Sequence, residues 1–135
     1  MDNHYQLSDK EFESAFKDCS LSSSLFSHEA HLRLAWLQIQ ANGVEEAINN
    51  VCNQIIKFVR YLGAEDKYHV TLTVAAVRIV NHFMESSKSD SFKGFISEFP
   101  VLNLDFKSLV EKHYSKDIFN SVVAKKEYIE PDVAF

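Results

Sequence analysis

The chain is poor in the residues that make tight turns, with three glycines and two prolines among 135 residues. An all-β fold needs many such turns, so this scarcity argues against a sandwich or barrel. Cysteine is also scarce: Cys19 and Cys52 have no CxxC spacing, and each falls on the apolar side of an expected helix. We therefore expect two free thiols that pack as small hydrophobic groups.

Positive charge is in deficit, since 14 Lys and Arg stand against 19 Asp and Glu for a net charge of −5. No basic face is present, so we expect neither nucleic acid nor an anionic membrane as a partner. Residues 1–5 lack the basic and apolar segments of a signal peptide. The most apolar stretch, residues 70–84, is interrupted by Arg78 and His82, which argues against a membrane span. We expect a cytoplasmic protein.

Several catalytic and binding motifs are missing as well. The chain has no glycine-rich phosphate loop, no GxSxG turn, no HExxH pair and no EF-hand loop. The chemistry that depends on those motifs is therefore set aside.

What the sequence does contain is apolar residues at helical spacing, bounded by capping residues. Ser8 and Glu11 form a capping box, Ser27 caps a second helix, and Gly43 and Gly63 end the second and third. These signals predict a single all-α domain over residues 1–135, a compact bundle of about four main helices. The expected helices are 9–19, 28–42, 44–62, 68–84, 92–99, 105–114 and 116–126, followed by an extended tail over 128–135.

The second helix directs a histidine toward the interior. On a wheel at about 100° per residue, His31 and Ala35 lie at the centre of the apolar face, with His28 and Gln38 beside them. The opposite face is expected to be solvated and carries Glu29, Arg33 and Gln40.

The fourth helix repeats this arrangement with His69 and Ala76, and Thr73 lies beside them. Small alanines leave space next to an imidazole, so we expect His28, His31 and His69 to converge on one cavity between the two helices. The solvated face of this helix is expected to carry Lys67, Thr71, Arg78, His82 and Glu85. The remaining histidines are expected to be ordinary surface or terminal residues: His4, His82 and His113.

Three interpretations of the cluster remain open. His28 and His31, three apart on one helix, could join His69 as ligands of a divalent transition metal such as Zn, Fe, Ni or Mn. A metal-free pocket could use an imidazole as acid or base on a small-molecule ligand, with Thr73 and Tyr68 orienting it. The histidines could instead form a hydrogen-bonded core network with Gln38, Thr73 or backbone carbonyls, in a non-catalytic interaction or structural module.

Three segments, in this order, resemble a family of small bacterial proteins with an FxHxxHLxxAW … YHxTxT … EPD pattern. The matching stretches are residues 26–36, 68–73 and 130–132. The resemblance covers most of the chain and implies no activity or cofactor. It implies that one set of residues belongs together, namely His28, His31, His69, Thr71, Thr73, Glu130 and Asp132. Thr71 fits this set only if the C-terminal tail covers it.

The tail is expected to supply a carboxylate, because the inner helix faces carry none. Glu130 and Asp132 flank Pro131, which favours extended backbone, and the chain then ends on apolar residues. We expect the tail to fold back over the bundle and bring Glu130 or Asp132 to the histidines. In the alternative, both carboxylates are solvated and Phe135 fills a surface groove.

Overall fold

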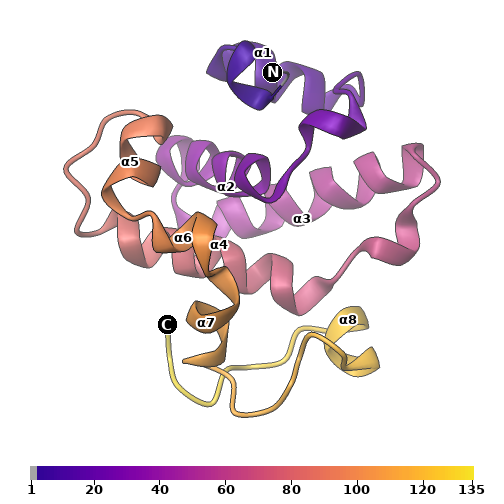
Figure 1. Cartoon of the computed structure of the whole chain (residues 1–135). Coiled ribbons are helices and arrows are strands. Elements are labelled where there is room, and N and C mark those ends of the chain that lie inside the picture. Colours follow the sequence, from indigo (N-terminus) through magenta and orange to yellow (C-terminus); the bar gives the residue numbers. More distant parts are fainter. Residues whose placement is uncertain (1–2) are drawn as a thin grey trace.

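The computed structural model describes residues 3–135, which form eight α-helices and three short 3-10 helices with no strand (Figure 1). The all-α fold predicted from the helical periodicity is confirmed. The N-terminal Met1 and Asp2 lie outside the described residues. The helices are α1 (Asp9–Lys17), α2 (His28–Asn42), α3 (Val44–Tyr61), α4 (Val70–Met84), α5 (Phe92–Glu98), α6 (Val101–Leu104), α7 (Phe106–Glu111) and α8 (Val122–Lys126).

The helices α2, α3 and α4 pack against one another and form the centre of the molecule (Figure 1). Gly43 joins α2 to α3 with a φ of 81°, a left-handed conformation that favours glycine. Short connections reverse the chain twice, so α2 and α4 begin at the end of the bundle where α3 ends. The core between them is apolar and includes Leu32, Leu34, Trp36, Val51, Ile55, Phe58, Ala75, Val77 and Val80.

The caps expected from the sequence bound the first two helices. Ser8 Oγ accepts from the backbone N–H of Glu11, whose carboxylate accepts from the N–H of Ser8. Ser27 Oγ accepts from the N–H of Ala30 at the start of α2. These contacts satisfy backbone donors that a helix start leaves free.

The C-terminal third departs from the expected helices. A short additional helix, α6, precedes α7, and α7 ends at Glu111 instead of continuing to residue 114. The helix expected over 116–126 is reduced to α8, because the Asp117 carboxylate bonds the N–H groups of Phe119 and Asn120. Such an Asp turn competes with helix formation. Ser121 then caps α8.

Two side chains expected on solvated faces are buried, so the wheel was wrong at both. Arg33 is 4% exposed and Thr71 is fully buried. The N-terminal segment covers Arg33, and the C-terminal tail covers Thr71. Thr71 Oγ1 donates to the carbonyl of Glu127 (2.8 Å) and accepts from the N–H of Ile129 (3.1 Å). A wheel treats a helix as isolated, whereas both faces here are covered by chain ends.

Candidate functional site

A cavity of about 570 Å³ opens at the end of the core where α2 and α4 begin and α3 ends. The structure brings five of the residues expected at the site to its wall: His28, His31, Tyr68, His69 and Thr73. Ala35 and Ala76, expected to leave room beside the imidazoles, line it too. Most of the remaining wall is apolar, including Phe26, Leu32, Ile55, Phe58, Leu72, Val77, Phe106 and Phe119. Such an apolar wall with few polar groups is typical of small-molecule sites.

His31 keeps one ring nitrogen available to the cavity. Its Nδ1 lies 2.9 Å from the carbonyl oxygen of Ser27, which can only accept, so Nδ1 carries the proton and Nε2 keeps its lone pair. The ring stacks on Phe26, with centroids 3.7 Å apart and planes 25° apart. Burial lowers the pKa of His31 to about 4, so the imidazole is neutral at pH 7. Residues 3–135 offer no hydrogen-bond partner to Nε2.

His28 is held at the rim by a contact with α6. Its Nε2 donates to the carbonyl of Leu102 at 3.1 Å, which leaves the neutral ring a lone pair on Nδ1. The ring also packs against Phe106, with centroids 5.0 Å apart. His28 therefore links the start of α2 to the segment that closes one side of the cavity.

His69 has both nitrogens occupied. Nδ1 accepts from the N–H of Leu72 at 3.1 Å, which makes His69 the N-cap of α4 rather than a residue within the helix. Nε2 donates to the carbonyl of Ile118 at 2.8 Å. His69 thus fixes the helix start and the 112–121 connection, and it has no lone pair left for a ligand.

Two further polar groups lie on the same wall. Thr73 Oγ1 donates to the carbonyl of His69 at 2.6 Å, so its hydrogen is engaged within α4. Burial raises the pKa of Tyr68, with a smaller contribution from its contact with Cys52, and the phenol is therefore un-ionised at neutral pH. Tyr68 and Thr73 add polarity to the wall without adding charge.

The histidines do not form the three-ligand metal centre that their spacing allowed. Within residues 3–135, no three His, Cys, Asp or Glu side chains converge closely enough to hold an ion. His69 would have to give up both its N-cap bond and its bond to Ile118. The donor set therefore does not fit the metal hypothesis.

Three expected supporting residues lie away from the cavity. Gln38 is buried, but its Oε1 accepts from Asn42 and Asn50 near the C-terminal end of α2. The tail does fold back, yet Glu130 is exposed, and the carboxylate of Asp132 binds Ser115. Neither tail carboxylate lines the cavity. The side chains of Thr71 and Tyr114, neither of which lines the cavity, hold the tail backbone instead.

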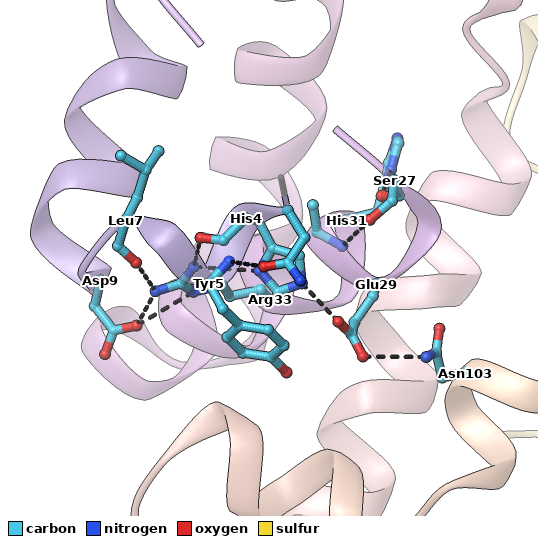
Figure 2. Close-up of polar contacts among 11 residues, drawn as sticks. His4, Tyr5, Leu7, Asp9, Ser27, Glu29, His31, Arg33 and Asn103 are labelled. Atoms are coloured by element: carbon cyan, nitrogen blue, oxygen red, sulfur yellow. Dashed lines mark hydrogen bonds and ion pairs between the residues drawn. The ribbon is translucent and has the colours of Figure 1, made fainter. Parts of the chain in front are cut away.

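A buried polar network beside the site was missed from the sequence. The Arg33 guanidinium donates to the carbonyls of His4 (2.7 Å) and Leu7 (2.9 Å) and to the carboxylate of Asp9 (2.8 Å) (Figure 2). The available signal was Arg33 itself, a lone charge within the nearly all-apolar run 30–39. A helix that is apolar all round is buried all round.

His4, expected to be an ordinary terminal residue, is also buried in this network. Arg33 Nη1 can only donate to His4 Nδ1 (3.2 Å), so the neutral ring carries its proton on Nε2 and donates it to Glu29 (2.7 Å). The other carboxylate oxygen of Glu29 accepts from Asn103 on α6 (Figure 2). The network thus ties the N-terminal segment and α6 to the first turns of α2.

No protein-family model, curated protein or solved structure shows a significant match to this chain. The resemblance to a small bacterial family remains a prediction. Among the described residues, 3–135, there is no helix with the length and apolar character needed to cross a bilayer.

Proposed function

We propose that this protein binds a small, mainly apolar molecule in the histidine-lined cavity, with His31 Nε2 accepting a hydrogen bond from the ligand. The observation that carries the proposal is the state of His31. The ring is oriented by Ser27 and Phe26, its tautomer is fixed, and its free lone pair belongs to a residue of the cavity wall. An acceptor on the wall of a mainly apolar pocket that finds no protein partner favours a ligand that can donate.

The other two histidines have a supporting role in this proposal. Each of these histidines donates a ring N–H to a backbone carbonyl in a segment that borders the cavity: His28 to Leu102 and His69 to Ile118. This use agrees with the structural interpretation of the cluster for those two residues. The cavity is then a preformed pocket, held open by polar contacts at its rim.

A pair of ligands of nearly the same shape tests the role of His31. Phenol carries a hydroxyl where toluene carries a methyl, so only phenol can donate to Nε2. We expect the preference for phenol over toluene to fall by about 2- to 10-fold in His31→Phe, the range expected for one neutral hydrogen bond. The measurement is the dissociation constant of each ligand from NMR titration, with shifts mapped to the cavity. Phe at this position keeps a ring against Phe26.

The matched control is His82→Phe, which makes the same change at an exposed histidine outside the cavity wall. This variant should keep the wild-type ratio. Equal ratios in wild type and His31→Phe would reject the role of His31, and absence of binding by both ligands would reject the pocket as a binding site.

A further inference from the structure

The charges around the cavity restrict the ligand further, in an inference that rests on the proposed function. Among residues 3–135, the cavity wall includes one lysine, Lys67, and no arginine, aspartate or glutamate. This is notable in a chain whose net charge is −5. The first turns of α2 and α4 also contribute wall residues, and helix N-termini carry partial positive charge. The C-terminal end of α3 also lies at the cavity, and its partial negative charge offsets the positive charge of one of these two N-termini.

The groups that face His31 and can titrate are few. They are His28 on α2 and Lys67, Tyr68 and His69 on the segment before α4, while the wall residues from α3 and α7 are apolar. None of them can supply a negative charge near neutral pH, because the phenol of Tyr68 is un-ionised. A proton on His31 therefore has no counter-ion in the protein, and a ligand would have to supply one.

His31 is arranged so that it can take up such a proton. Protonation of Nε2 leaves the Nδ1–H bond to Ser27 unchanged, since that nitrogen is already the donor. His69 lacks this option, because its Nδ1 lone pair is used by Leu72. His31 can thus gain a proton at a free nitrogen and lose no contact inside the helix. His28 also has a free ring nitrogen, but its side chain is exposed at the rim, whereas that of His31 is half-buried.

We propose that the cavity binds a small monocarboxylate with an apolar body, and that its carboxylate binds at His31 together with one proton from solvent. The proton lies between a carboxylate oxygen and Nε2, so the site gains no net charge. Phe26, Phe58, Phe106 and Phe119 surround the space that the apolar body would fill. Lys67, at the exposed edge, attracts the anion. Burial lowers the pKa of His31 to about 4, and no carboxylate from residues 3–135 lies on the wall to offset this effect.

The probe is benzoate, compared with its neutral analogue benzamide, by isothermal titration calorimetry between about pH 6 and pH 8. Free benzoate is ionised and His31 is neutral throughout this range, so binding should take up close to one proton. The benzoate affinity should fall about tenfold per pH unit, whereas that of benzamide should not change with pH. Buffers with different heats of ionisation count the proton directly.

Three variants locate the effect. His31→Phe should abolish the pH dependence of benzoate binding. Lys67→Gln should weaken benzoate by about 2- to 5-fold and keep the slope, as expected for one exposed charge. Lys88→Gln, at an exposed lysine beyond the far end of α4, is the charge-matched control and should leave both unchanged.

Benzoate binding without proton uptake would overturn the inference, as would a pH slope that survives in His31→Phe. Failure of benzoate to bind while phenol still binds would overturn the carboxylate and leave the proposed function standing. Failure of both probes would overturn both proposals. Absence of the slope in the wild-type protein overturns the inference even if a variant does not fold.

Discussion

Removal of the Arg33 guanidinium should be among the most costly single changes in this protein. Arg33→Met retains the aliphatic stem but deletes five N–H donors and the guanidinium carbon that lies 4.7 Å from the centroid of the Phe12 ring. The carbonyl and Nδ1 of His4 would lose a donor in a buried position, and the carbonyl of Leu7 in a partly buried one. Asp9 is 56% exposed and would regain water instead.

The cost follows from these acceptors. Each orphaned buried acceptor costs about 1–3 kcal/mol, so the two on His4 alone give about 2–6 kcal/mol. Removal of one partner from a buried charged network costs a similar 3–5 kcal/mol. We therefore expect the free energy of unfolding to fall by about 3–5 kcal/mol, a large share of the roughly 5–15 kcal/mol of a typical domain.

Urea unfolding followed by the fluorescence of Trp36, the one tryptophan and a buried residue, measures this loss. The matched control is Arg60→Met, because Arg60 pairs with Glu65 on the surface and both side chains are 58% exposed. That pair should contribute less than about 1 kcal/mol. If Arg33→Met costs no more than Arg60→Met, the buried network does not stabilise the fold and the reasoning above is wrong.

Two further predictions concern pH and the tail. Folding lowers the pKa of His31 from an ordinary 6.5 to about 4, so the unfolded chain binds more protons than the folded chain between these pH values. The free energy of unfolding should therefore be unaffected by His31 above pH 6.5 and should decline as the pH falls toward 4. Urea midpoints should therefore decline less steeply with acid in His31→Phe, and parallel curves would contradict this. Thr71→Val should cost about 1–3 kcal/mol by orphaning the Glu127 carbonyl and Ile129 N–H. Hydrogen exchange should then accelerate at Ile129, whereas Thr71→Ser should keep it protected.

The sequence by itself determined the helical framework and part of the cavity wall. The caps at Ser8 and Ser27 and the stop at Gly43 act within one turn, so neighbouring residues are enough to locate those helix ends. The facing direction of His31 follows equally from helical geometry. These features depend on contacts a few residues apart, which a pattern can show.

Tertiary structure decided which polar groups are buried and which ring nitrogens are free. The partner of His28 lies 74 residues away and that of His69 lies 49 away, so no local pattern could reveal which lone pairs they keep. Arg33 and Thr71 belong to faces that a wheel places in water, yet the two chain ends cover them. Burial depends on which distant segment packs over a face, and that choice is made only when the whole chain folds.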